Sequence, residues 1–260
     1  MTSRREFLRG GLGLSAIIAS GESPAIVRSM VAARQSIAAG RKAYTARDYV
    51  QDGLILNYNG VESGGYGEAS QNGQWVELAG QINTTQSGLF TFGKDYANFD
   101  GTVSINTSYA WQDNQPLTFE VMFEIDSLLQ YIPVIDCTSS GGWTLKREST
   151  SNNGTFFAAR DINANAYRFI YTTFLVGSKN KYRGRADSNI MRLNQNEIVF
   201  NGIKKPPLST TLKIGRTSTG TTRYFVGRMN YLRIYNRFIT DKEAAHNDAV
   251  DAAIFNRSTT

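Results

Sequence analysis

The sequence of 260 residues contains a single cysteine, Cys137, and a single histidine, His246, and both counts exclude chemistry. One thiol forms no intrachain disulfide, and a zinc site needs several Cys or His ligands. A hydrolase with a Ser-His-Asp triad would have to use His246, which lies in an alanine-rich C-terminal segment. We therefore expect His246 to be an ordinary residue on a helix surface, and we expect no zinc site.

Long apolar runs are missing as well. No stretch approaches the ~18 consecutive apolar residues of a membrane-spanning helix, so we expect a soluble body and no integral membrane protein. Proline is scarce, with five residues, whereas glycine numbers 24 and aromatic residues make up 12% of the chain. Short apolar or alternating runs between Gly, Asn, Asp and Ser fill most of the sequence, and this pattern favours strands joined by turns.

The net charge of +6 is unevenly distributed. Residues 1–45 hold seven of the 28 basic residues and two of the 22 acidic ones, so the remaining 215 residues are almost neutral. A nucleic-acid-binding domain concentrates positive charge on its folded body. The charge distribution therefore argues against a nucleic-acid partner.

The N-terminal segment reads SRREFLR over residues 3–9, followed by GGLGLSAIIASG and by small residues around Pro24. This order resembles a twin-arginine (Tat) export signal and implies an extracellular or cell-surface location. The alternative is a helical or flexible basic tail that stays on the mature protein and attaches it to other subunits. The Arg-bearing helical pattern of residues 23–42 favours this alternative. Either way, we place residues 1–45 outside a folded domain of residues 46–260.

From about Ala46 onwards, turn residues recur every 8–15 positions, and no helical segment separates the apolar runs. The pattern predicts an all-β fold, a β-sandwich or jelly roll. The expected strands are 54–58, 75–78, 89–92, 102–106, 117–125, 132–136, 143–147, 155–159, 167–173, 197–200, 211–215, 223–226 and 228–235. The polar segments 148–154 and 177–188 are expected to be exposed loops.

The C-terminal end, residues 227–247, has the most specific local pattern. The alternation of apolar residues shifts once between Met229 and Leu232, which predicts a bulge in the last strand. Thr240 and Glu243 have the spacing of a helix capping box, with Ile239 placed before it as one half of a hydrophobic staple. A long strand followed by a short C-terminal helix is therefore expected.

Four segments in order resemble the LamG-like jelly rolls of the concanavalin A-like lectin/glucanase superfamily. They are YVQDGLILNYNGVES (49–63), the FDG step at 99–101, LTFEVMFEIDSL (117–128) and GRMNYLRIYNRFITDKE (227–243), which together span residues 49–250. Residues 24–66 are also similar to LamG-like proteins of gut bacteria and their phages. The resemblance implies a concanavalin A-like jelly-roll β-sandwich with a short C-terminal helix.

Glucanases of this superfamily carry three carboxylates in an E-x-D-x-x-E or E-x-D-x-E run on one strand. Alternate strand residues share a face, so such a run projects its acids into one cleft. Here Glu124 and Asp126 are followed by SLLQ, and the third carboxylate is missing. We expect residues 117–125 to place their odd-numbered apolar side chains in the core. Glu120, Glu124 and Asp126 would then lie on a solvated face rather than in a catalytic site.

A sugar site needs an aromatic platform and planar polar groups, and the best candidate region is 141–185. The predicted ligand-binding residues are Trp143, Arg147, Arg160, Asp161, Asn163, Tyr167, Tyr182 and Arg183. Trp75 and Trp111 lie in segments expected to be buried. No catalytic residue, metal ligand or cofactor is predicted. Calcium stays open, since Asp95, Asp100 and Asp136 lie near turns, although Asp residues at strand ends commonly form turns.

These observations leave three functional hypotheses. The first is a non-enzymatic, extracellular or surface-displayed recognition module that binds a glycan or another surface ligand. The second is a structural or adhesion component of a phage particle or surface appendage, anchored by residues 1–45 and located on the virion surface. The third is a degenerate jelly-roll glycoside hydrolase.

Overall fold

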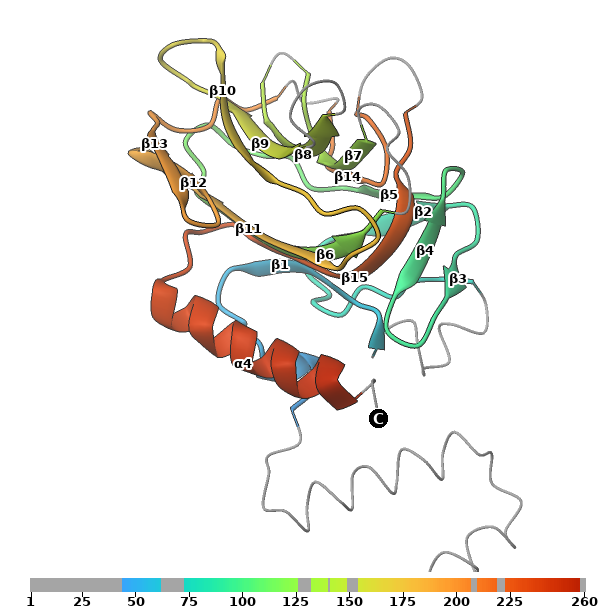
Figure 1. The fold of residues 1–260 in the computed structure, drawn as a ribbon. Coiled ribbons are helices and arrows are strands. Elements are labelled where there is room, and N and C mark those ends of the chain that lie inside the picture. The colour runs from blue at the N-terminus through green and yellow to red at the C-terminus, as the bar shows by residue number, and fades with distance from the viewer. Residues whose placement is uncertain are drawn as a thin grey trace, which may run out of the picture. The chain divides into compact units, whose positions relative to one another are not determined.

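The structure, a computed structural model, describes residues 44–61, 73–125, 132–139, 141–148, 154–206, 210–218 and 223–257. Over these residues two antiparallel sheets stack as a sandwich, and one helix lies across the outer face of the larger sheet (Figure 1). The predicted jelly-roll β-sandwich with a C-terminal helix is confirmed. The N-terminal segment, residues 1–43, lies outside the described residues.

The larger sheet has eight strands. Its order is β13-β12-β11-β6-β15-β4-β3, and β1 pairs with the C-terminal half of β15, on the same side of it as β4. Its strands are β1 (Leu54–Asn59), β3 (Thr91–Phe92), β4 (Ala97–Asp100), β6 (Leu117–Glu124), β11 (Asn180–Ala186), β12 (Ile190–Leu193), β13 (Asn196–Val199) and β15 (Val226–Tyr235).

The smaller sheet has seven strands in the order β10-β9-β8-β7-β14-β5-β2. They are β2 (Thr84–Ser87), β5 (Ser104–Thr107), β7 (Ile132–Asp136), β8 (Trp143–Glu148), β9 (Gly154–Arg160), β10 (Tyr167–Thr173) and β14 (Lys213–Ile214). A short 3-10 helix, η1 (Ala46–Asp48), precedes β1, and α4 (Asp241–Arg257) follows β15.

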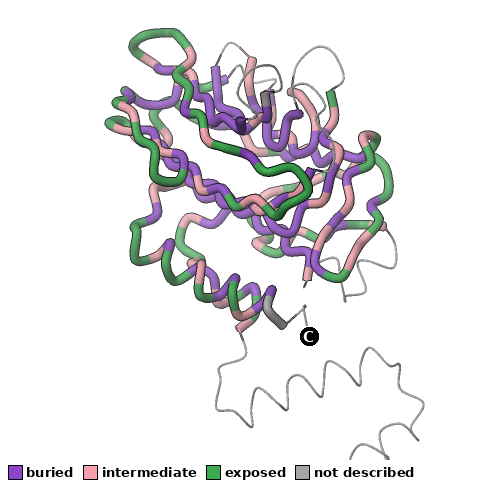
Figure 2. Tube along the Cα trace, in the orientation of Figure 1, coloured by how far each residue is buried: buried purple, intermediate pink, exposed green. Residues whose placement is uncertain are grey.

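The core lies between the two sheets, as the burial pattern in Figure 2 shows. Phe119, Val121 and Phe123 of β6 are buried there, which confirms the predicted core face of this strand. The ring of Phe119 stacks on the indole of Trp143 from the opposite sheet, with centroids 5.5 Å apart and planes nearly parallel. Aromatic packing across the sandwich supplies much of the hydrophobic stabilisation of the fold.

The predicted C-terminal pattern is confirmed. The register of β15 against β6 shifts between Met229 and Tyr231, as expected of a bulge. Thr240 Oγ1 accepts a hydrogen bond from Glu243 N at 3.2 Å, and Glu243 Oε2 accepts one from Thr240 N at 2.8 Å. Ile239 packs with Ala244 in a small apolar cluster, so both the cap and the staple form. The long strand therefore leads directly into α4.

The prediction of an exposed loop at 177–188 is wrong. Residues 180–186 form β11, an inner strand of the larger sheet that pairs with β6 and β12. Tyr182, Gly184 and Ala186 face the core, while the alternating cationic residues face away from it. The charged composition concealed the strand, because its polar face is matched by partners that are remote in the sequence. Segment 149–153 of the other predicted loop lies outside the described residues.

Other strand predictions differ from the structure at the edges. Residues 75–78 form no strand, although Trp75 is buried and its backbone N donates to Gln86 Oε1 at 3.0 Å. In the predicted strand 223–226 only Tyr224 forms an isolated bridge before β15 begins. The short strands β2, β4 and β12 were not predicted. Their runs of four residues are too short to show a clear alternation.

Candidate functional site

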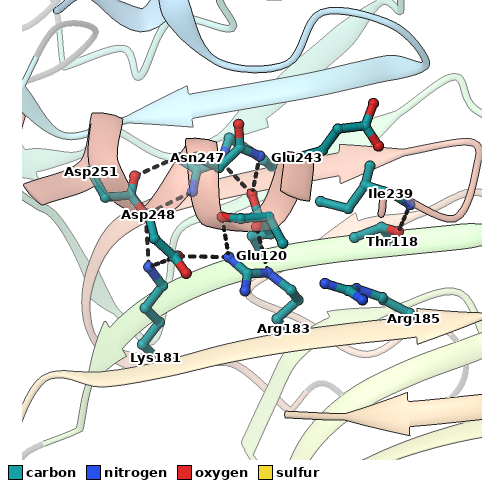
Figure 3. Close-up of polar contacts among 12 residues, drawn as sticks. Thr118, Glu120, Lys181, Arg183, Arg185, Ile239, Glu243, Asn247, Asp248 and Asp251 are labelled. Atoms are coloured by element: carbon teal, nitrogen blue, oxygen red, sulfur yellow. Dashed lines mark hydrogen bonds and ion pairs between the residues drawn. The ribbon is translucent and has the colours of Figure 1, made fainter. Parts of the chain in front are cut away.

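The even-numbered residues of β6 lie on a covered face, so the prediction of a solvated face is wrong. Thr118 and Glu120 are fully buried, and Glu124 is half-buried. The reason is tertiary: α4 folds back across this face of the sheet, with Arg183 of β11 beside Glu120 (Figure 3). The other neighbouring strand, β15, brings Arg233 to Glu120. Asp126 lies outside the described residues.

Glu120 is the centre of a buried charge network. Its Oε1 accepts from Arg183 Nε at 2.6 Å, and its Oε2 accepts from Arg233 Nε at 2.9 Å. Asn247 of α4 adds a hydrogen bond from Nδ2 to Oε2 at 2.8 Å. Both oxygens of this carboxylate therefore accept from protein donors, and the side chain has no exposed surface that a substrate could contact.

Acidic residues of α4 complete the network. Asp251 accepts two hydrogen bonds from Arg233, at 2.8 and 2.9 Å, and Asp248 accepts from Arg183 at 2.6 Å. Burial opposes ionisation of Asp251, but the guanidinium of Arg233 outweighs it and lowers the pKa of this carboxyl. Burial likewise opposes the charge of Arg233, yet Asp251 and Glu120 raise its pKa well above the usual value. Both Asp251 and Arg233 are therefore held in their ionised forms.

A cleft of about 670 Å³ opens beside this network, between α4 and the hairpin strands β11–β13. Four cationic side chains line it, and each has a carboxylate partner. The pairs are Lys181–Asp248, Arg183–Asp248, Arg185–Asp241 and Arg192–Glu197. Three of these pairs join β11 to α4, whereas Arg192–Glu197 joins β12 to β13.

Three of the eight predicted ligand-binding residues do not lie where a ligand can reach them. Trp143 and Arg147 have no exposed surface, and Tyr182 is buried with its hydroxyl 3.1 Å from the carbonyl of Thr173. A fourth, Arg183, lines the cleft beside α4, where it pairs with Glu120 and Asp248. Inside the core the indole of Trp143 stacks on the ring of Phe119 and meets Trp111 edge to face, so it offers no platform to a sugar.

The other four predicted residues come together where β9 ends and β10 begins. Arg160 and Tyr167 pair in register, and the Arg160 guanidinium lies 5.6 Å from the centre of the Tyr167 ring. The exposed Asn163 lies in the connecting turn. Asp161 is buried beneath it and accepts hydrogen bonds from the backbone N of Asn163 and Ala164, both at 2.9 Å. Sequence reasoning thus located one end of a surface feature.

That feature is a row of aromatic side chains along β10, an edge strand of the smaller sheet. Tyr167, Phe169 and Tyr171 occupy alternate positions of this strand and all lie on its outer face, with the centres of neighbouring rings 6.3 Å apart. Phe169 is 45% exposed and Tyr171 46%. Phe156 of β9 packs against the latter two rings, at 5.8 and 5.7 Å, and supports them from below. We call these four residues the aromatic strip.

Phe169 and Tyr171 were missed as candidates, although the signal was in the sequence. In YRFIYTT every second residue from Tyr167 is aromatic, while Ile170 on the opposite parity is buried in the core. Aromatic residues on the parity opposite to the core face of a strand are exposed where no other element covers that face, and contiguous exposed aromatic groups are candidates for a binding surface.

Among the described residues no group of three or more His, Cys, Asp and Glu side chains is placed to hold a metal ion. The three Asp residues considered for calcium have protein partners. Asp95 pairs with Lys179, Asp100 accepts from Thr102 within a turn, and Asp136 accepts from Thr138 and Ser218. No helix in the described ranges is both long and apolar enough to cross a membrane.

His246, on the exposed side of α4, confirms its expected place on a helix surface. Its Nε2 lies 2.6 Å from the backbone oxygen of Asp48. Trp75 and Trp111 are buried, as predicted.

Comparison of the sequence with protein families and with curated proteins finds no match. The fold is similar to solved structures of botulinum neurotoxin binding domains. They include the binding domain of neurotoxin DC in complex with rat synaptotagmin II (TM-score 0.54, 11% identity), which is matched over 78% of this chain and 52% of that chain. The receptor binding domain of neurotoxin D (TM-score 0.54, 12% identity) is matched over 76% and 53%.

A third similar structure is of botulinum neurotoxin type C, whose cell entry is dependent upon interaction with two ganglioside molecules (TM-score 0.50, 10% identity, 76% and 52% covered). The chain spans about half the length of these proteins. At such low identity the likeness concerns the fold alone, and it agrees with a β-sandwich.

Proposed function

We propose that this protein is a non-enzymatic recognition module that binds a glycan across the aromatic strip. The observation that carries the proposal is the row of Tyr167, Phe169 and Tyr171, whose rings alternate on the outer face of an edge strand. Aromatic faces bind the apolar faces of sugar rings, and tyrosine hydroxyls bond to sugar hydroxyls. Within the strip, Phe156 packs against the rings of Phe169 and Tyr171, so these two rings are held in place before a ligand arrives.

The state of the carboxylates supports a non-enzymatic role. A retaining glycosidase needs two carboxyl groups ~5–5.5 Å apart in an open cleft. Glu120 is instead buried beneath α4 and hydrogen-bonded to two arginines, and Glu124 lies 3.6 Å from Arg228. We expect no reducing sugar from β-glucans incubated with the purified protein. Release that Glu124→Gln abolishes would revive the hydrolase hypothesis.

The proposed function is tested with a glycan array and the double variant Phe169→Ala/Tyr171→Ala. Leu89→Ala is the matched control, because Leu89 is an exposed apolar residue outside the strip. We expect the double variant to lose binding and Leu89→Ala to keep it. Both should melt within a few degrees of the unmodified protein, because exposed positions contribute little to stability. Unchanged binding by the double variant, or no bound glycan at all, contradicts the proposal.

One of the similar structures is a receptor binding domain, another is in complex with synaptotagmin II, and the cell entry of a third toxin is dependent upon gangliosides. As part of the same proposal, we infer that this chain also binds a surface ligand. The narrower proposal, that the domain is LamG-like and belongs to the concanavalin A-like superfamily, rests on the four sequence segments alone. The Tat-like segment supports a location outside the cytoplasm as part of this proposal. Intact mass of the native protein tests this: loss of about 25 residues supports export. A retained N-terminus supports anchoring to a particle or appendage instead.

A further inference from the structure

A pair of cationic side chains lies at one end of the aromatic strip. Arg160 is the last residue of β9, directly opposite Tyr167 in the register, and its guanidinium contacts the Tyr167 ring. Lys204 lies beside it, because Lys204 N donates to the carbonyl of Arg160 at 2.8 Å. Both side chains are half-buried.

These two cations converge on one neutral oxygen. Asn165 Oδ1 accepts from Lys204 Nζ at 2.7 Å and from Arg160 Nε and Nη2 at 3.3 and 3.2 Å. An amide oxygen carries no net charge, so it satisfies hydrogen bonds without balancing the two positive charges. Ion pairs in the described part of the chain include neither Arg160 nor Lys204. The end of the strip is therefore positively charged.

The carboxylate that is nearest in the sequence cannot balance this charge. Asp161 is fully buried and accepts from two backbone N atoms and from Asn201 Nδ2 at 2.9 Å. Its other neighbour is Arg168, at 3.7 Å. Turning this carboxylate outward towards Arg160 would break these bonds and leave buried donors unpaired.

We propose that the glycan on the aromatic strip is acidic, and that its carboxylate or sulfate group is held by Arg160 and Lys204. This inference rests on the proposed function, because the strip supplies the sugar-binding surface. An anionic oxygen replaces the Asn165 amide oxygen as acceptor for both cations, and charge-assisted hydrogen bonds are stronger than those to a neutral amide. The planar guanidinium matches the two oxygens of a carboxylate or sulfate, and the ammonium adds a point charge.

The test uses the full-length protein on an array of matched glycans, in which each neutral oligosaccharide is paired with its carboxylated and its sulfated derivative. Arg160→Gln/Lys204→Gln removes both charges. Lys205→Gln is the control, since this neighbouring exposed lysine does not bond to Asn165. Thermal melts of all variants check that the fold is retained.

We expect the unmodified protein to prefer the acidic member of a pair by about tenfold or more. The double variant should lose this preference while keeping the weaker binding to the neutral member, and Lys205→Gln should change neither. Because the cations are partly exposed, binding to the acidic member should also weaken as salt rises from 50 to 500 mM.

The outcomes separate this inference from the proposed function. Equal binding of neutral and acidic members, with both lost in Phe169→Ala/Tyr171→Ala, overturns the acidic-ligand inference and leaves the glycan-binding proposal standing. An acidic preference that survives Arg160→Gln/Lys204→Gln also overturns the inference, since other residues would then hold the charge. Absence of any glycan binding by the unmodified protein overturns both.

Discussion

Glu120 of β6 and Arg233 of β15 form an ion pair with no exposed side-chain surface, and Glu120 Oε2 lies 2.9 Å from Arg233 Nε. The guanidinium of Arg233 is also enclosed by two tyrosine rings, with centres 4.0 Å away for Tyr49 and 4.2 Å away for Tyr231. Asp251 of α4 accepts hydrogen bonds from Nη1 and Nη2 of Arg233. The pair therefore connects the sheet, the helix and the start of the domain.

Glu120→Gln should destabilise the fold by about 3–5 kcal/mol, because it removes the one carboxylate shared by the buried Arg233 and the partly buried Arg183. The measurement is the free energy of unfolding from urea denaturation. Glu124→Gln is the control on the same strand; its partner Arg228 lies 3.6 Å away and is partly exposed, so the loss should stay within about 1 kcal/mol. Equal losses for the two variants would show that the buried network contributes nothing special.

Acid should weaken the docking of α4. The pKa of Asp251 is lowered by Arg233, which outweighs the opposing effect of burial, and the pKa of Asp248 is lowered by Arg183 and Lys181 in the same way. Their contribution to stability is complete above the unfolded pKa of about 3.9 and is lost as the pH falls through the lower folded values.

The melting temperature should therefore fall steeply below about pH 4, and hydrogen exchange should increase first in α4. The Asp251→Asn variant should have a lower melting temperature at neutral pH, and its melting temperature should fall less steeply in acid. A melting temperature that stays constant from pH 6 to pH 2.5 would contradict this account.

Thr240→Ala should remove the N-terminal cap of α4 at a cost of about 1 kcal/mol, which lowers the melting temperature by ~2–4 °C. Differential scanning calorimetry measures both. Lys242→Ala is the control in the same helical turn, since Lys242 is exposed and takes no part in the capping box. The cap also involves Glu243, whose pKa is lowered to about 2 by Arg237 and the Thr240 donors against the effect of burial.

Gly184→Ala should destabilise the fold by ~1–3 kcal/mol through overpacking. A Cβ atom on Gly184 would lie 2.1 Å from the ring of Phe119, which is itself held against Trp143. Chemical denaturation of the single variant and of Gly184→Ala/Phe119→Leu forms the test. The smaller leucine makes room, so the two substitutions should be less than additive, and strict additivity would mean that the contact is unimportant.

Part of the fold could be predicted because the information is local. The odd-numbered residues of 117–125, the bulge after Met229 and the cap at Thr240 each follow from spacing within a few residues. Strand β11 could not be predicted in this way. Its Lys181, Arg183 and Arg185 read as a polar loop until α4, some 60 residues later, supplies Asp241, Asp248 and Asp251 as partners.

The candidate site also contains residues that the sequence predicts correctly and residues that it does not. Arg160 and Tyr167 were identified from residue type and lie at the surface, whereas Trp143, predicted on the same grounds, lies in the core. Burial of a tryptophan depends on what the opposite sheet places against it, here Phe119, and no local pattern contains that information.

By itself the sequence determined an all-β chain with a capped C-terminal helix and a nearly neutral body, because alternation, turn residues and capping act between near neighbours. The tertiary structure decided which polar residues are buried and which aromatic residues are exposed. Glu120 is buried because α4 covers its face of the larger sheet, and two strands and the helix supply its hydrogen-bond donors. Phe169 is exposed because it lies on the outer face of the smaller sheet, opposite to the buried Ile170. Both outcomes depend on contacts between segments that are distant in the chain.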